Sequence, residues 1–423
     1  MRWAMRRRLW WRVLPVFVSC SLGAQNVALV ADHLYTMDAG PQGGPGMVLI
    51  RDGKVDEVRQ GAKGEPPAGF QVIHGLYVTP GLIDADTTTG VSGAYNIPAD
   101  QDQDESSDPN TADVNVRDSL NPEDLLYRYV NSYGVTTMQV APGPRNPIAG
   151  RAGIFKTAGP QSPFRTVDQL IVRLNSGMVF NLGDTPKETY GANHKAPVTR
   201  MRTAEMIRDA LTQARQYQDK WDKWKQDGSD LSKEPTIEPK VAALADVVAG
   251  KTPAIFNAYR ADDIDTAIRI GTEFHLKYML ASVAEGYLIR DRIKQAGVPC
   301  LVGAVMQAFE GLETANATYE NAALLQQAGI PVAIMTGYEA YVPKSRVLLF
   351  EAAVAAANGL GMESALRAIT VSPAKILGID DRVGSLSKGK DGDVVVFDGD
   401  PFEYTSHVQQ VLVQGSVTYS LHP

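Results

Sequence analysis

The sequence predicts an α/β protein: a (β/α)8 TIM-like barrel joined to a small β-sandwich that both chain termini build. The chain has 423 residues, enough for a barrel of about 250–300 residues and one companion domain. Short apolar runs alternate with amphipathic stretches over residues 79–378, which is typical of a parallel barrel. Residues 25–78 and 379–423 instead contain short strand patterns separated by turn residues, which predicts one composite β domain.

Residues 1–24 have the pattern of a secretory signal peptide. Five arginines precede the apolar stretch 13–22, and small residues up to Ala24 precede a polar start. We therefore expect secretion to a periplasm with cleavage after Ala24. The alternatives are a lipoprotein anchored at Cys20, which residues 17–19 disfavour, and an uncleaved anchor. Cleavage would change the net charge from −7 to about −12, which argues against nucleic acid as a partner.

The strands of the composite domain are bounded by turn signals. Asp52 and Gly53 separate two apolar runs and predict a hairpin, and Gln414 and Gly415 predict another turn. Strands from the two ends would pair most economically in one sandwich beside the barrel. The expected strands are residues 27–30, 47–51, 54–59 and 71–74, then 393–397, 408–413 and 417–419.

Between these ends, buried strands of four to seven residues alternate with helices. Strands are predicted at residues 135–140, 253–257, 277–282, 298–303 and 331–336, and helices at 122–132, 261–273, 284–295 and 320–328. Residues 203–225, with Trp221 and Trp224, predict a long inserted helix. The acidic stretch 100–113 is interpreted as a solvated lid, with a cation-binding loop as the alternative.

Residues 78–88, Val-Thr-Pro-Gly-Leu-Ile-Asp-Ala-Asp-Thr-Thr, resemble the first barrel strand of the amidohydrolase superfamily. The segments 181–187, 199–201, 260–264 and 284–287 resemble parts of its imidazolonepropionase-like exported members. Residues 365–374, Ala-Leu-Arg-Ala-Ile-Thr-Val-Ser-Pro-Ala, with 383–391, resemble its C-terminal signature. The resemblance covers about residues 27–419 and implies a metal-dependent hydrolase of amide-type carbon–nitrogen bonds.

The resemblance also implies a divalent metal ion, zinc or another, at the carboxyl ends of the barrel strands. Such an ion activates water and needs converging imidazoles or carboxylates. The positions at which the family carries these ligands are occupied here by Asp86, Thr88, Asn257, Ser282 and Gly337. All five are substituted, so we expect an impaired or non-catalytic site and no catalytic residue is assigned.

Asp86 is the remaining candidate for a metal ligand. With Thr88, Asn257 and Asp184 it offers only oxygen atoms, which suit calcium or magnesium better than zinc. Of the six histidines, only His194 is expected to reach the barrel mouth, so an imidazole-rich site is excluded. The other five are His33, His74, His275, His407 and His422.

Lys156, Asp184 and His194 are pocket candidates. By resemblance, a lysine at the position of Lys156 can be carbamylated to bridge two metal ions; the alternative is an ion pair with Asp184 or Asp86, because a buried lysine needs a partner. Cys300 lies in an apolar strand and is expected to be an inert buried thiol. Ser282 has no histidine assigned beside it, so no nucleophilic triad is predicted.

Three hypotheses follow from the sequence. The first is a pseudoenzyme that binds a small molecule or short peptide, or assembles as a homo-oligomer or with an active relative. The second is a hydrolase that uses the surviving oxygen ligands. The third is a solute-binding protein without turnover. The sequence alone does not choose among them, because specificity lies in the loops above the strands.

Overall fold

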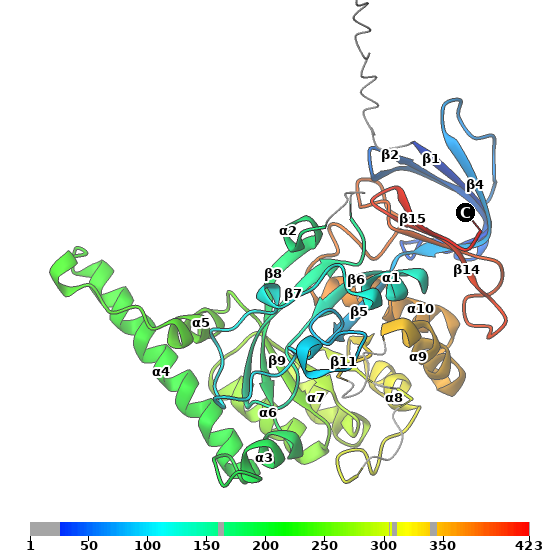
Figure 1. Ribbon diagram of the computed structural model, residues 1–423. Helices are drawn as coiled ribbons and strands as arrows, with labels where there is room; N and C mark the ends of the chain where they lie inside the picture. Colours follow the sequence, from blue (N-terminus) through cyan, green and yellow to red (C-terminus); the bar gives the residue numbers. More distant parts are fainter. Residues whose placement is uncertain (1–25, 160–164, 304, 307–310, 339–344, 423) are drawn as a thin grey trace, which may run out of the picture.

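The structure is a computed structural model that describes residues 26–159, 165–303, 305–306, 311–338 and 345–422. Figure 1 shows a sheet domain beside a barrel, with one long helix leading away from the barrel. The predicted signal peptide lies outside the described residues. None of the described helices has both the length and the apolar character that crossing a membrane requires.

The described strands from the two ends of the chain form one seven-stranded sheet with the order β15-β14-β13-β4-β1-β2-β3. β4 joins the two contributions, because it pairs in parallel with β1 on one side and antiparallel with β13 on the other. The predicted sandwich is therefore one continuous sheet. Its strands are β1 Val27–Leu34, β2 Gly44–Arg51, β3 Lys54–Gln60, β4 Gln71–Pro80, β13 Val394–Phe397, β14 Val408–Val413 and β15 Ser416–Ser420.

A second sheet of eight strands, in the sequential order β5 to β12, forms the barrel. A parallel bridge between Thr87 and Gly337 brings its first and last strands together. The barrel strands are β5 Leu82–Thr87, β6 Val135–Val140, β7 Ile148–Lys156, β8 Ile171–Asn181, β9 Ala254–Ala258, β10 Tyr278–Ser282, β11 Cys300–Val302 and β12 Val332–Ile334.

The barrel departs from a regular (β/α)8 pattern at β7, which is antiparallel to both β6 and β8. Only residues 141–147, with Pro142, Gly143 and Pro144, connect β6 to β7. A parallel crossover needs a dozen residues or more, so this connection allows only a hairpin. The remaining seven strands are parallel, and their carboxyl ends define the barrel mouth.

Small and large buried side chains together fill the barrel interior. Ala85, Ala152, Ala281 and Ala333 belong to one core cluster with residues of α11, which closes the base. The outer core packs helices against the strands. The helices are α1 Leu125–Ser132, α2 Val167–Leu170, α3 Asp184–Gly191, α4 Arg200–Gln226, α5 Pro239–Val248, α6 Ala261–Glu273, α7 Arg290–Ala296, α8 Asn321–Gln327, α9 Leu348–Ala355, α10 Met362–Ala368 and α11 Val371–Ile376.

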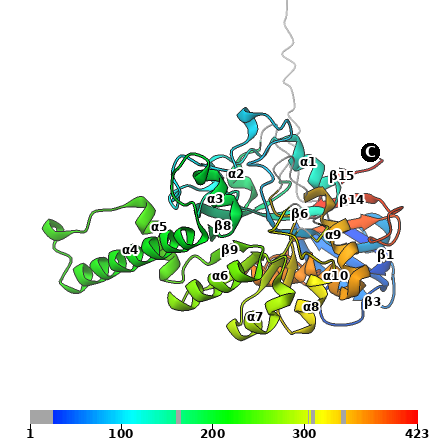
Figure 2. The same cartoon turned by 90° about the horizontal axis from the view of Figure 1, so that it is seen from below.

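The predicted inserted helix is α4, and its second half projects from the barrel with α5 beside it (Figures 1 and 2). The last buried residue of α4 is Ala214. Beyond it, the rings of Trp221 and Trp224 meet edge to face with centroids 5.4 Å apart. The Trp224 Nε1 atom donates a hydrogen bond of 2.8 Å to the Asp230 carbonyl. The second half of α4 and α5 form a projecting arm, and the two tryptophans therefore stabilise this arm.

Candidate functional site

The structure places the five family-equivalent positions at the carboxyl ends of the barrel strands. Asp86 lies at a bulge near the end of β5, and Thr88 follows that strand. Asn257 and Ser282 lie at the ends of β9 and β10. Gly337 lies beyond β12, where its N–H donates to the Asp86 carbonyl over 2.9 Å. The chain thus brings these positions to one edge of the barrel.

Two of the substituted residues are hydrogen-bonded to each other. The Ser282 hydroxyl donates to Asn257 Oδ1 over 2.5 Å, and Asn257 Nδ2 donates to Asn181 Oδ1 over 3.2 Å. Asn181 in turn donates to the Asn146 carbonyl over 2.8 Å. A hydroxyl-and-amide chain of this kind satisfies its members internally. It links β8, β9 and β10 where the family would have imidazoles.

The backbone at the end of β10 is strained. Ser282 and Val283 both have positive φ, 69° and 45°, and a β-branched residue rarely adopts this conformation. The Val283 N–H is nevertheless held by the Ala258 carbonyl at 2.9 Å. A strained backbone conformation of this kind persists only where the surrounding structure holds it, and such conformations are frequent at functional sites. Ser282, which donates to Asn257, lies at this strained position.

Asp86 and Thr88 are the candidates whose side-chain oxygen atoms have no partner among the described residues. Asp86 is the one residue of β5 that keeps partial exposure, and its carboxylate has no partner in the described part of the chain. Burial of the carboxyl group, and then the charge of Asp84, raises the pKa of Asp86 well above its ordinary value. The Thr88 hydroxyl is buried, also with no partner among the described residues.

A group of hydroxyls beside Asp86 was not predicted from the sequence. Asp84 accepts hydrogen bonds from the Thr336 N–H at 3.0 Å and from its hydroxyl at 2.5 Å. Thr87 and Thr89 both contact the Ser345 hydroxyl, at 2.8 and 2.7 Å. Burial raises the pKa of Asp84 to about 6. These hydrogen bonds join β5 to the segment that follows β12, where the barrel closes, so Asp84 has a structural role.

These side chains do not fit the metal site that the family resemblance implies. Among the described residues, no group of three or more His, Cys, Asp or Glu is placed to hold a metal ion. Asp86 is the only carboxylate at the five positions, Asn257 Oδ1 already accepts from Ser282, and Gly337 has no side chain. Zinc requires several nitrogen, sulfur or carboxylate ligands. We therefore derive no chemistry through a bound metal.

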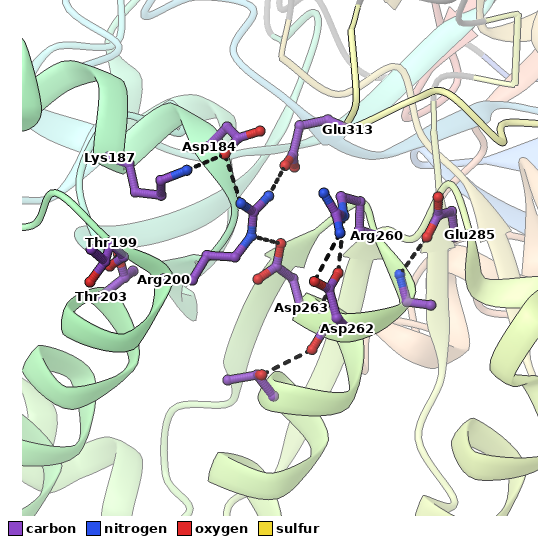
Figure 3. Close-up of polar contacts among 12 residues, drawn as sticks. Asp184, Lys187, Thr199, Arg200, Thr203, Arg260, Asp262, Asp263, Glu285 and Glu313 are labelled. Carbon is purple, nitrogen blue, oxygen red and sulfur yellow. Dashed lines mark hydrogen bonds and ion pairs between the residues drawn. The ribbon is translucent and has the colours of Figure 1, made fainter.

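A second polar cluster lies at the same end of the barrel and is centred on Arg200 (Figure 3). The guanidinium contacts Asp184 at 2.9 Å, Asp263 at 2.9 Å and Glu313 at 2.6 Å. Lys187 adds an ion pair with Asp184 at 2.6 Å. Asp184 is therefore occupied by two cations, and its predicted role as an oxygen ligand is not supported by these contacts.

Helix ends position this cluster. Asp184, Arg200 and Asp263 lie in the first turns of α3, α4 and α6, and carboxylates are stabilised by the partial positive charge at such ends. The Thr199 side chain caps α4 by accepting from the Arg202 N–H. Gly183 has a φ of +95°, and a Cβ there would come within 2.5 Å of a Glu313 carboxylate oxygen. Glycine at this position therefore lets Glu313 approach.

The two linked carboxyl groups have opposite pKa shifts. Burial would raise the pKa of Asp184, but hydrogen bonds from Lys187 and Glu313 and the Arg200 charge outweigh it, holding that pKa at about 2. For Glu313, burial and then the hydrogen bond and charge of Asp184 raise the pKa to about 7, although Arg200 opposes the shift. The two shifts have a common cause, because each carboxyl group lies beside the other and beside Arg200.

The raised Glu313 pKa predicts a pH dependence of stability. Its ordinary pKa is 4.5, so folded protein keeps a proton between pH 4.5 and 7 that unfolded protein releases. Stability from this group is complete below pH 4.5 and falls, by about 1–3 kcal/mol, as pH rises to 7. Urea unfolding should therefore show that Glu313→Gln gains stability relative to the parent across this window. If the stability of Glu313→Gln followed that of the parent across this pH range, the raised pKa of Glu313 would not be the cause. The same conclusion would follow if the exposed control Glu273→Gln gained stability in the same way.

The remaining predicted pocket residues lie elsewhere. Lys156 ends the antiparallel β7, so it reaches the base of the barrel, where it pairs with Asp391 at 3.0 Å and Asp393 at 2.5 Å. The predicted partners Asp184 and Asp86 were wrong, because β7 runs opposite to its neighbours. His194 is exposed in the turn after α3 and has no side-chain partner in the described part of the chain. Neither Lys156 nor His194 contacts the five family-equivalent positions at the barrel mouth.

Cys300 is buried within β11, and burial raises the pKa of its thiol to about 12. A thiol of this kind is not a nucleophile at neutral pH. The predicted burial of this cysteine is confirmed.

The barrel and its terminal sheet define the class of the fold, an α/β barrel with a separate β domain. A model of the amidohydrolase family matches residues 251–420. The crystal structure of an amidohydrolase from Thermotoga maritima MSB8 is 30% identical, with a TM-score of 0.85, over 93% of this chain and 100% of that one. The chain belongs to the amidohydrolase family.

Two curated relatives are more distant. Amidohydrolase tasK of Hapsidospora irregularis is 24% identical over 88% of this chain, and imidazolonepropionase of Thermoplasma acidophilum is 29% identical over 25%. The matched segments make up 40% and 27% of those relatives' own lengths. Solved structures such as a molinate hydrolase, 15% identical with a TM-score of 0.58, share the fold alone.

Proposed function

We propose that this protein is a non-hydrolytic member of the amidohydrolase family that binds a small ligand at the barrel mouth. The observation that carries the proposal is the hydrogen-bond chain from Ser282 through Asn257 to Asn181. Strand-end side chains that would bind the ion in the family are here donors and acceptors for one another. A mouth of this kind retains polar groups that orient a ligand but lacks the water-activating centre.

The signal-peptide pattern of residues 1–24 supports a periplasmic location for this binding activity. The projecting arm formed by α4 and α5 offers exposed surface for a second copy or an active relative. Assembly of this kind stays a prediction. Measuring the mass of the protein in solution tests it.

Metal content is the first test of the proposed function. We expect protein purified without chelators to contain well under one equivalent of zinc, manganese, iron, calcium or magnesium by elemental mass spectrometry. We also expect no hydrolysis of N-acyl amino acids or dipeptides when these ions are added. Asp86→Asn should leave both results unchanged. A stoichiometric transition metal, or ion-dependent turnover that Asp86→Asn removes, would contradict the proposal.

The second candidate is a hydrolase that uses oxygen ligands. The carboxylate of Asp86 and the buried hydroxyl of Thr88 favour it, because neither group has a hydrogen-bond partner among the described residues. Oxygen-only sites bind calcium or magnesium but polarise water weakly. Turnover that magnesium or calcium stimulates and Asp86→Asn removes would establish this candidate.

A further inference from the structure

The helix α9 has the reverse of the usual amphipathic pattern. Its one charged residue, Glu351, is fully buried, and the Glu351 carboxylate accepts a hydrogen bond from the Met306 N–H at 2.8 Å. The outward face instead has Phe350, which is exposed, and Ala353, which is partly exposed. A surface helix normally turns its apolar side chains inward and its charged side chains toward water. The outer face of α9 therefore has the composition of a buried surface.

The helix α1 and the residue that follows it carry an exposed apolar stripe. Leu125, Tyr129 and Tyr133 are spaced four residues apart, so they lie along one face of the helix. All three side chains are exposed. The rings of the two tyrosines meet edge to face with centroids 5.1 Å apart, and their hydroxyl oxygens are 3.3 Å apart. The tyrosines therefore hold each other in place along this stripe.

The turn Ser345–Val347, just before α9, brings the two exposed faces to one surface. It contacts both α1 and α9. The hydrogen bond with Tyr129 raises the pKa of Tyr133, and the nearby charge of Arg346 in this turn opposes the shift. Both helices lie on the side of the barrel away from the projecting arm (Figures 1 and 2). We call this surface the α1–α9 patch, and it consists of Leu125, Tyr129, Tyr133 and Phe350.

The size of the α1–α9 patch indicates a protein partner. Its members are 53%, 44%, 41% and 48% exposed, in chain order. An aromatic side chain has roughly 200 Å² of surface, so the four together expose about 400 Å². Apolar patches of this size on a monomer are often functional. A standard interface takes about 800 Å² from each partner, so the patch would supply about half of one side, with polar residues around it supplying the rest.

We propose that the α1–α9 patch is the interface between two copies of this chain. A two-fold contact places the same surface on both sides, so that surface must be complementary to itself. An apolar patch meets this condition, because no like charges face each other at its centre. At its rim, Arg128 pairs with Glu123 at 3.3 Å, and a two-fold contact lets the Arg128 of each copy face the Glu123 of the other. The inference goes beyond the proposed ligand-binding function and does not depend on it, because it is read from mass.

Sedimentation velocity of the purified protein at tens of micromolar concentration tests the proposal. We expect the parent to have the mass of two copies, and Tyr129→Glu with Phe350→Glu to have the mass of one. Each change occurs twice across a two-fold axis, so the pair should raise the dissociation constant at least about a hundredfold. Both side chains are about half exposed, so circular dichroism should show the same fold in the variant.

Leu231→Glu is the matched control. Leu231 lies in the loop that joins α4 to α5 on the arm, and it is 78% exposed. We expect this variant to keep the mass of two copies. If it became a single chain while the double variant did not, the interface would lie on the arm and the proposal would be overturned. A parent that sediments as a single chain would overturn the second copy as the occupant of the patch.

A second double variant, Tyr129→Ala with Phe350→Ala, keeps the proposal testable if the glutamates prevent folding. Alanine is the strongest helix former, so both helices should persist. Removing the two rings without adding charge should still raise the dissociation constant at least about tenfold. A dimer that dissociates at the same concentration in the parent and in the alanine variant would overturn the assignment of the patch.

Discussion

Replacing Lys156 by methionine is expected to lower the free energy of unfolding by about 3–5 kcal/mol. The Lys156 side chain is 3% exposed, and its ammonium group pairs with Asp391 and Asp393, which are themselves buried. Methionine has nearly the same shape, so the change removes the charge while keeping the packing. The two carboxylates would then share a desolvated site with only the outer cations. Urea unfolding at neutral pH measures the loss.

The same cluster supplies the control. Lys54 also pairs with Asp391, at 2.5 Å, but it is 49% exposed, so Lys54→Met should cost under about 1 kcal/mol. Adding Asp393→Asn to Lys156→Met should recover part of the loss, because one uncompensated charge disappears. A buried ion cluster would be contradicted if the two lysine changes lowered the free energy of unfolding equally. It would also be contradicted if the double variant recovered none of the lost free energy. Because Lys156 joins the barrel to the terminal sheet, the expected loss also tests how these parts depend on each other.

Arg200→Gln is expected to have the second largest effect, a loss of about 2–3 kcal/mol at pH 8. The guanidinium contacts three carboxylates, and without it Asp184, Asp263 and Glu313 would repel one another. Repulsion raises the pKa of these groups in the folded protein. The variant therefore keeps its stability at low pH, where these carboxyl groups are protonated, and loses stability as pH rises from about 4 to 7. Unfolding at pH 4 should show a much smaller difference from the parent.

Arg208→Gln is the matched control, since Arg208 pairs with one exposed carboxylate, Glu273, at 2.7 Å. We expect it to change stability by under about 1 kcal/mol at any pH. A pH-independent loss in Arg200→Gln would show that packing of the side chain, not its charge, accounts for the effect. A loss no larger than that of Arg208→Gln would contradict the cluster.

Local patterns predicted much of the barrel. The strand predicted at residues 135–140 coincides with β6, and the helix predicted at 261–273 coincides with α6. Both predictions succeeded because a buried strand and an amphipathic helix each have a pattern of apolar residues that is visible within a short segment. The strand β8 was not predicted, since its first half is only partly buried and carries polar residues. The antiparallel direction of β7 was also missed. The short Pro-Gly-Pro connection was the available signal for it.

The sequence by itself determined the fold class and the resemblance that the comparisons confirm, and it predicted that the family's metal-binding side chains are substituted. Only the tertiary structure decided what replaced them: Asn257 bonded to Ser282, Arg200 among three carboxylates, and Lys156 at the base of the barrel. The reason is the range of the interactions. Arg200 and Glu313 lie 113 residues apart, and Lys156 and Asp393 lie 237 apart. Pairs of this kind depend on strand direction and loop path, which no local pattern specifies.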